Sequence, residues 1–450
     1  MTKMMNYTAT TNACKLCKPL GASLAFRGVE DCVPFLHGSQ GCATYMRRYI
    51  ISHFNEPIDI ASSSLGERNA IYGGGANLKL GLQNVTSKYK PKLIGVATTC
   101  LTETIGDDVP MLLHEYHKEF GTSSSPLVVA VSTPSYAGTH MEGFTAAVTA
   151  VVNQLATESE PNNTINIFSG FISTADIRYL KEVCTDYGIE ATLLPDYSDT
   201  LDGPALNDYP LIPKGGTPLK AIAAMGGAKA SVELGWTFPK KTGGKVLQDK
   251  FDTKLSQLGH PIGIRASDAF FELLAELSGN EIPKKYTQAR GRLIDSMVDG
   301  HKYIFGKRAV VYGEEDLVIG ITGFLAEIGI HTVLCASGGK SGQFEKKVKE
   351  ALDGIDCELP LVKEDVDFFD IEALAKELGT DIVIGHSKGY AFSRKENLPL
   401  IRVGFPIHDR VGGQRILHLG YQGAQQLFDQ ITNTIIDKKQ SDSSVGYSYM

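Results

Sequence analysis

Hydrophobic residues along this chain occur as short continuous runs that alternate with longer amphipathic stretches. Such runs are typical of parallel strands that are buried on both faces of a sheet. The predicted strands are 93–97 (LIGVA), 127–131 (LVVAV), 165–168 (INIF), 309–312 (AVVY), 332–335 (TVLC), 381–384 (DIVI) and 400–403 (LIRV).

Helical periodicity fills the stretches between these strands. Helices are predicted at 143–155, 174–187, 266–277 and 317–329, with a long one at 287–305 that Gly306 ends. Strands that alternate with helices form βαβ units. The fold class is therefore α/β, with doubly wound parallel sheets.

The chain has 450 residues, which exceeds what one hydrophobic core usually fills. A polar stretch at 159–164 (SEPNNT) and the start of a new strand after Gly306 and Lys307 are the candidate boundaries. We expect three α/β domains of similar size: an N-terminal domain at 1–160, a middle domain at 161–305 and a C-terminal domain at 306–450.

Composition excludes several classes of protein. A hydrophobic content of 42% with 21% charged residues describes a soluble globular protein, and a net charge of -7 gives no reason to expect a nucleic-acid partner. No apolar run approaches the roughly 18–20 residues that span a bilayer, so no membrane partner is expected. The first residues lack the apolar core of an export signal. We expect a cytoplasmic protein, whose eight cysteines are not paired as disulfides.

Three of those cysteines stand where the chain leaves a hydrophobic run or enters a glycine-rich loop. Cys17, Cys42 and Cys100 lie in the contexts CKLCKPLGA, HGSQGC and VATTC. An iron–sulfur cluster needs deprotonated thiols, and nearby glycines let backbone N–H groups approach its sulfides. Cys100 also follows a predicted strand, at the sheet edge where ligands usually bind. If the three thiolates converge, they predict an iron–sulfur protein, although a lone cysteine at such an edge more often packs in the core.

The other cysteines have simpler interpretations. Cys14 and Cys17 form a CxxC pair, but the second pair that a zinc site needs is absent. Cys17 is the better ligand candidate of the two because it adjoins the turn at Pro19. The remaining cysteines lie in or beside apolar runs and are interpreted as packing residues: Cys32, Cys184, Cys335 and Cys357.

Two polar residues near these cysteines have open roles. His37, in HGSQGC, could be a ligand or a proton donor, or equally a buried histidine bonded to the backbone. Ser135, in STPSYAG, could contact a ligand or a metal, or serve only in a turn.

Three further motifs carry weaker signals. Asp107 and Asp108 are interpreted as helix-end or surface groups. Glycines 73–75 lack a surrounding phosphate-loop pattern, so close backbone packing is the better interpretation. The HSKG sequence at 386–389 follows a predicted strand and could bind an anion.

Several motifs in one order resemble the nitrogenase β-subunit superfamily. They are CKPLGA, HGSQGC, SHFNEP, YKPKLIGVATTCLTETIGDDV, STPSYAGTH, IRVGFPIHDR and GYQGA, and the resemblance runs from about Asn12 to Ile436. It implies three Rossmann-like domains, an iron–sulfur cluster, and a homologous α-like partner in an α2β2 heterotetramer. It also implies the nitrogenase iron protein as a transient reductase.

The resemblance covers two kinds of subunit. One is the N subunit of the scaffold on which the iron–molybdenum cofactor matures, which holds a 4Fe–4S cluster with an E-type partner. The stretches MEGFTAAVTAVV, LLPDYSDTLDG and VGGQRILHLGYQGA are similar to this subunit, including the double glycine of Gly412 and Gly413. We expect the scaffold function on this ground, with Cys42 as the cluster ligand.

The second kind is the catalytic β subunit, which shares an 8Fe–7S P-cluster with its α partner. Its three cluster cysteines match Cys17, Cys42 and Cys100, and its serine that can ligate the oxidised cluster matches Ser135. This catalytic subunit, of a molybdenum, vanadium or iron-only system, is the alternative. A metal-free α/β enzyme that binds a nucleotide or a sugar is a further alternative.

Overall fold

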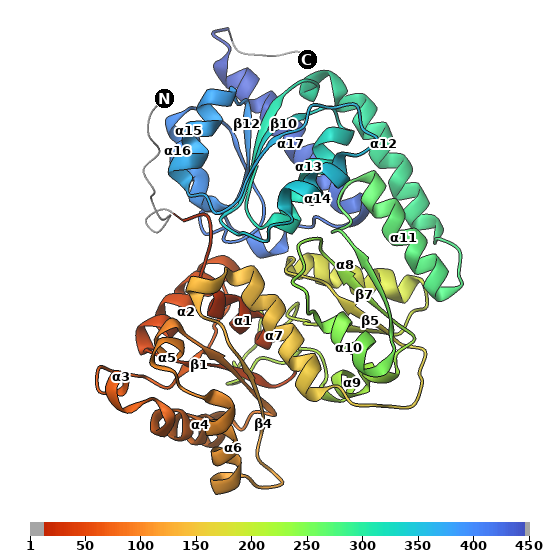
Figure 1. Cartoon of the computed structure of the whole chain (residues 1–450). Coiled ribbons are helices and arrows are strands. Elements are labelled where there is room, and N and C mark those ends of the chain that lie inside the picture. The colour runs from red at the N-terminus through yellow and green to blue at the C-terminus, as the bar shows by residue number, and fades with distance from the viewer. Residues whose placement is uncertain (1–12, 446–450) are drawn as a thin grey trace. The chain divides into compact units, whose positions relative to one another are not determined.

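The chain forms three sheets, each with helices on its faces (Figure 1). The computed structural model describes residues 13–445. The first residues, where the sequence predicts no export signal, lie outside the described range. Contacts divide the described chain into two compact units, Leu16–Gln257 and residues 13–15 with residues 258–445. The domain boundaries expected from the sequence stay a prediction. No helix among the described residues is both long and apolar enough to cross a bilayer.

The first sheet has the strand order β2-β1-β3-β4, and its neighbouring strands are parallel. Its strands are β1 (Cys32–His37), β2 (Ala61–Ser62), β3 (Leu93–Thr98) and β4 (Leu127–Val131). Helices α4 (Gly75–Tyr89) and α6 (Val109–Phe120) pack on one face through a core that includes Leu82, Leu113 and Val96. Helices α1 (Lys18–Arg27) and α7 (His140–Leu155) also pack against this sheet.

The middle sheet belongs to the same unit and has the order β6-β5-β7-β8. Its strands are β5 (Ile165–Phe168), β6 (Ala191–Leu194), β7 (Ala230–Leu234) and β8 (Lys254–Leu258). The principal helices beside it are α8 (Thr174–Asp186) and α10 (Gly243–Phe251). The β5–β6 and β5–β7 pairs are parallel.

The third sheet forms the core of the other unit and is parallel throughout, with the order β11-β10-β9-β12-β13. Its strands are β9 (Arg308–Tyr312), β10 (His331–Ala336), β11 (Leu361–Lys363), β12 (Ile382–Gly385) and β13 (Leu400–Arg402). The main helices of this unit are α11 (Ile264–Ser278), α12 (Lys284–Ile304), α13 (Glu315–Glu327), α15 (Phe368–Leu378) and α17 (Gly420–Asp442). The α/β class with three parallel sheets is therefore confirmed.

Each of the seven predicted strands occurs, with ends that coincide with the prediction or differ from it by one residue. Strand β1 was not predicted, because Pro34 interrupts its apolar run. Proline cannot donate a ladder hydrogen bond. The structure accommodates it because the pairing of β1 with β2 begins only at Phe35. Strand β7 was also missed, since Ser231 and Glu233 break its apolar pattern while lying fully buried.

Candidate metal centre

The loops that leave β1 and β3 meet at the carboxyl edge of the first sheet. In the order β2-β1-β3-β4 the direction of winding reverses between β1 and β3, and doubly wound sheets bind ligands at that switch point. Cys42 follows β1, in the first turn of α2 (Gln40–Phe54), and Cys100 follows β3 as the first residue of α5 (Cys100–Ile105). Two of the three predicted cysteines therefore flank the switch point.

Close backbone contacts hold these two loops together. The Thr99 N–H donates to the carbonyl of His37 over 3.1 Å, and the Thr102 hydroxyl donates to the same carbonyl over 3.0 Å. A Cβ atom on Gly38 would lie 2.1 Å from the Thr99 hydroxyl oxygen. The glycine of HGSQGC is thus required where the chain after β1 passes the chain after β3.

Cys17 reaches the same neighbourhood from α1, for which it is the N-cap residue. The Lys18 N–H donates to the Ser135 hydroxyl oxygen over 3.3 Å, and the Ser135 N–H donates to the Cys100 sulfur over 3.2 Å. Ser135 therefore bonds both to the residue after Cys17 and to Cys100. It also opens a single 3-10 turn, so its contact role and its turn role coexist.

Cys42 is tied to this group through its own helix. The Ser39 hydroxyl donates to the Cys42 sulfur over 3.4 Å. One turn later stands Tyr45, whose pKa is raised by burial and further by the nearby Tyr49 hydroxyl and Cys17 thiol. The loop that carries Cys42 meets the loop that carries Cys100 through the bonds of Thr99 and Thr102 to the His37 carbonyl.

Exposure separates the candidate ligands from most of the other cysteines. Cys17, Cys42 and Cys100 form no disulfide and are half-buried. Burial raises the thiol pKa to about 12 in four others, which keeps them protonated: Cys14, Cys32, Cys184 and Cys335. Cys357 is half-buried rather than packed in a core, and burial still raises its thiol pKa.

The donor set fits a multinuclear cluster at the surface of the chain. The Ser39 hydroxyl donates to the Cys42 sulfur and the Ser135 N–H donates to the Cys100 sulfur. Hydrogen bonds of this kind are usual around iron–sulfur clusters. Within residues 13–445, no group of three or more His, Cys, Asp or Glu side chains could by itself hold a single metal ion.

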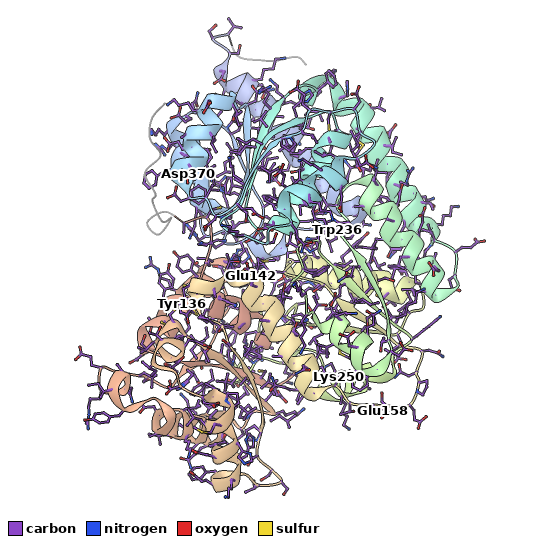
Figure 2. The ribbon with its side chains drawn as sticks, in the orientation of Figure 1. Tyr136, Glu142, Glu158, Trp236, Lys250 and Asp370 are labelled. Atoms are coloured by element: carbon purple, nitrogen blue, oxygen red, sulfur yellow. The ribbon has the colours of Figure 1, made fainter. Side chains whose placement is uncertain are left out.

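Helices α1 and α7 pack closely against each other, which fixes the position of Cys17 relative to the turn that contains Ser135. A Cβ atom on Gly21 of α1 would lie 1.7 Å from the His140 carbonyl oxygen, and one on Gly143 of α7 would lie 1.8 Å from that of Lys18. The His140 N–H donates to the Leu16 carbonyl over 3.0 Å. In Figure 2, Tyr136 and Glu142 mark this end of α7.

His37 is buried, as one of the two interpretations expected, but its bonds are to side chains rather than to the backbone. Its Nδ1 lies 3.0 Å from the Ser63 hydroxyl and its Nε2 lies 3.0 Å from the Asp107 carboxylate. Asp107 also accepts from the Gly74 N–H over 3.0 Å, so its carboxylate is not a surface group, whereas Asp108 is the N-cap of α6, as expected of a helix-end residue. A Cβ atom on Gly74 would lie 2.5 Å from that carboxylate, which explains the glycine by close packing.

We predict a specific pH dependence of stability from His37. Burial lowers the pKa of His37, and the Asp107 carboxylate offsets this only in part. The unfolded chain, with a histidine pKa near 6.5, then binds the proton more readily than the folded chain. Stability should fall as the pH drops below about 6.5, by up to about 1.4 kcal/mol per pH unit from this residue.

Thermal unfolding midpoints of the isolated chain, measured at about pH 7.5 and about pH 5.5, test this predicted pH dependence. A His37→Gln variant should be less stable at both values but should lose less on acidification than the natural chain. Equal losses for the two proteins would show that His37 does not titrate in this way.

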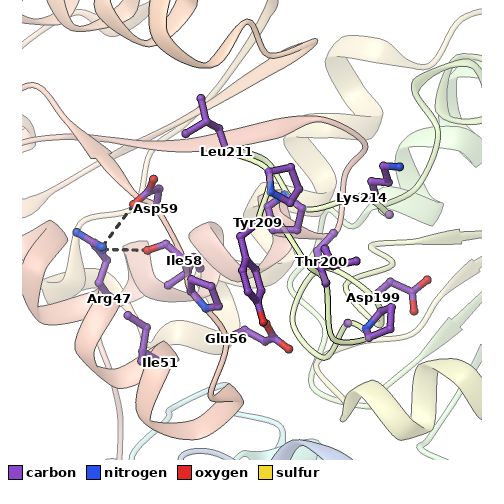
Figure 3. A pocket seen from close by; sticks show the side chains of 17 residues that line it. Arg47, Ile51, Glu56, Ile58, Asp59, Asp199, Thr200, Tyr209, Leu211 and Lys214 are labelled. Carbon is purple, nitrogen blue, oxygen red and sulfur yellow. Dashed lines mark hydrogen bonds and ion pairs between the residues drawn. The ribbon is translucent and has the colours of Figure 1, made fainter.

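A separate pocket of about 460 Å³ lies in the same unit, beside the C-terminal half of α2 (Figure 3). Apolar side chains and prolines dominate its lining, including Ile51, Leu206 and Tyr209. Arg47 is engaged at its rim, donating to the Ile58 carbonyl and pairing with Asp59. Such a lining does not match the phosphates of a nucleotide, so the pocket gives no support to the metal-free enzyme.

Comparison with known proteins agrees with this geometry. The family model described as nitrogenase component 1 type oxidoreductase matches residues 17–436. The nitrogenase molybdenum-iron protein beta chain of Clostridium pasteurianum is 36% identical over 428 residues, covering 95% of this chain and 93% of the relative. The nitrogenase vanadium-iron protein beta chain of Trichormus variabilis is 34% identical over 435 residues, covering 93% and 92%.

A solved structure gives the same answer for the fold. A chain of nitrogenase Cp1 at pH 6.5 superposes with a TM-score of 0.95 at 34% identity, covering 99% of this chain and 98% of its own. The family match and these identities cover almost all of the described chain. The chain therefore belongs to the nitrogenase component 1 family and is of the β type.

Proposed function

We propose that this chain is the β subunit of a nitrogenase, in which Cys17, Cys42 and Cys100 hold one half of a P-cluster. The observation that carries the proposal is that Ser135 bonds both to Cys100 and to the residue after Cys17, at the sheet edge where the loop that carries Cys42 meets the loop that carries Cys100. The relatives reported above are named as nitrogenase β chains, and they favour this function over the scaffold function expected from the sequence. A homologous α subunit would supply the remaining ligands in an α2β2 tetramer.

The cluster, when bound, would take electrons from the docked iron protein and pass them on towards the partner subunit. Residues of this chain surround the proposed cluster site. Cys17 and Cys42 stand at the starts of α1 and α2, where backbone N–H groups are left unpaired within the helix. The Ser135 N–H and the Ser39 hydroxyl donate to the sulfurs of Cys100 and Cys42, and such bonds would tune the potential of a cluster held there.

The scaffold function remains the second candidate, favoured by the double glycine. Gly412 adopts a left-handed φ of 85° and precedes a 3-10 turn at Gly413–Arg415. Under that function Cys42 alone would serve a 4Fe–4S cluster shared with an E-type partner. Both functions predict iron on Cys42, so Cys17 and Cys100 decide between them.

Activity of the natural complex is the first test. The chain should be purified anaerobically with its partner, and iron content and acetylene or dinitrogen reduction should be measured with the iron protein and a reductant. Substrate reduction by a complex that holds an eight-iron cluster supports the β subunit. An iron-containing complex that reduces no substrate would support the scaffold, and an iron-free complex would contradict both.

A change at Ser135 should leave the amount of iron intact. In a Ser135→Ala variant the backbone N–H that donates to Cys100 remains, and only the hydroxyl that accepts from the Lys18 N–H is lost. Iron content should match the natural complex, while the EPR spectrum of the oxidised cluster should change. Ser132→Ala is the matched control, because that serine donates to Glu103 instead. An unchanged oxidised spectrum in Ser135→Ala would remove the serine from the ligand set.

A further inference from the structure

The carboxylate of Glu103 ties together the loops that follow β3 and β4 in the first sheet. Glu103 lies in α5, three residues after Cys100, and its N–H donates to the Thr99 carbonyl over 3.2 Å. One carboxylate oxygen, Oε1, accepts from the Thr98 hydroxyl and from the Ser132 hydroxyl, each over 2.5 Å. Thr98 ends β3, and Ser132 directly follows β4, the strand paired with β3. A single side chain from the helix of Cys100 therefore bonds to both loops.

Thr98 carries this link on to the turn that contains Ser135. A carboxylate can only accept hydrogen bonds, so the Thr98 hydroxyl must give its one proton to Glu103. Its oxygen is then left to accept, and it accepts from the Thr133 N–H over 2.8 Å. The Thr133 hydroxyl donates back to the Thr98 carbonyl over 2.7 Å, and both threonines are buried. Two residues later, the Ser135 N–H donates to the Cys100 sulfur, so Glu103 fixes the hydroxyl orientation on which this series of bonds depends.

We propose that Glu103 is a positioning residue, which holds the Ser135 N–H against the Cys100 sulfur by way of Thr98. The inference rests on the proposed function, in which Cys100 is a cluster ligand. Hydrogen bonds to the ligand sulfurs help to set the potential of an iron–sulfur cluster, because they stabilise the negative charge that reduction adds. A weakened bond from the Ser135 N–H should therefore make the potential more negative.

The first test measures the loop after β4 in the isolated full chain, without any cluster. Glu103→Ala removes the acceptor, whereas Glu103→Gln keeps a side-chain oxygen that can accept from the same hydroxyls. Amide hydrogen exchange of residues 132–137, which include the Thr133 and Ser135 N–H groups, should be about fivefold faster in Glu103→Ala, as the loss of one typical hydrogen bond allows. Glu103→Gln should exchange at the natural rate. Glu115→Ala is the matched control, because this carboxylate on α6 pairs with Lys79 instead.

The second test measures the cluster in the complex purified anaerobically with its partner. Glu103→Ala should give a perturbed EPR spectrum and a more negative midpoint potential, and Glu103→Gln should restore both towards the natural values. A carboxylate that only stabilised the fold would lower the unfolding temperature without moving the potential. Ser132→Ala should keep the natural spectrum, because the bond from the Thr98 hydroxyl to Glu103 remains.

Thr98→Val reaches the same link from the strand. It keeps the branched shape of the side chain but loses the hydroxyl that joins Glu103 to the Thr133 N–H, so it should repeat both effects of Glu103→Ala. Natural exchange rates in both variants, or faster exchange with a natural spectrum and potential, would overturn the inference alone. It would also be overturned if Glu103→Gln behaved like Glu103→Ala, since the charge rather than the bond would then matter. An iron-free natural complex would instead defeat the proposed function, and the inference with it, whatever the exchange rates of the chain.

Discussion

Replacing Cys100 by alanine should remove the cluster from the purified complex and reduce acetylene reduction to background, and so should replacing Cys17. Each change deletes one of the three proposed thiolates, and Ser135 bonds both to Cys100 and to the residue after Cys17. Neither Cys14 nor Cys32 can replace the lost thiolate, because both are buried and their thiol pKa is raised to about 12. Iron quantification and EPR of the anaerobic complex measure the effect.

The controls separate ligand loss from general damage. Cys357→Ala removes a half-buried thiol that no part of the proposed site uses, and it should leave iron and activity unchanged. Cys42→Ala should abolish iron under either candidate function. Full iron content in both Cys17→Ala and Cys100→Ala, with loss only in Cys42→Ala, would exclude the P-cluster and establish the single-ligand scaffold.

A Gly21→Ala substitution should destabilise the chain by about 1–3 kcal/mol or more and should lower its iron content. In an open helix position the same change would stabilise by roughly 0.5–1 kcal/mol. Here the methyl group would lie 1.7 Å from the His140 carbonyl oxygen, so α1 and α7 must separate. Because α1 begins at Cys17, its displacement moves a ligand. Thermal unfolding and iron quantification check both effects.

Gly143→Ala should behave in the same way, because its methyl group would lie 1.8 Å from the Lys18 carbonyl oxygen. Gly291→Ala is the matched control, since this glycine lies inside α12 with no atom within 4 Å of its Cβ position. The control should be neutral or slightly stabilised. If all three variants unfold alike, the close crossing of α1 and α7 does not limit stability.

Apolar runs were enough to predict seven strands, because strands such as β4 are uniformly hydrophobic. The pattern failed where tertiary contacts replace hydrophobicity. Asn166, on β5, donates to the Ser231 hydroxyl of β7, and Glu233 accepts from the Gly244 N–H over 2.6 Å. A buried polar residue that finds such a partner breaks the apolar alternation without weakening the strand.

The candidate site shows the same limit. Cys17, Cys42, Cys100 and Ser135 could be named from their loops, although their role as ligands stays a proposal. The Asp107 contacts to His37 and Gly74 could not be predicted, because they join positions 70 and 33 residues apart. The contact between Lys388 and the Ala13 carbonyl was missed for the same reason, since 375 residues separate them. The scaffold function was expected from local similarities such as the double glycine. The complete set of three cysteines matches the catalytic β subunit instead, and it received less weight.

The most direct test of the central claim is an iron anomalous difference map from crystals of the anaerobically purified complex. The proposed function predicts iron density within bonding distance of all three sulfurs, those of Cys17, Cys42 and Cys100, and continuous with density on the partner. Density that contacts Cys42 alone, or no cysteine of this chain, would contradict it.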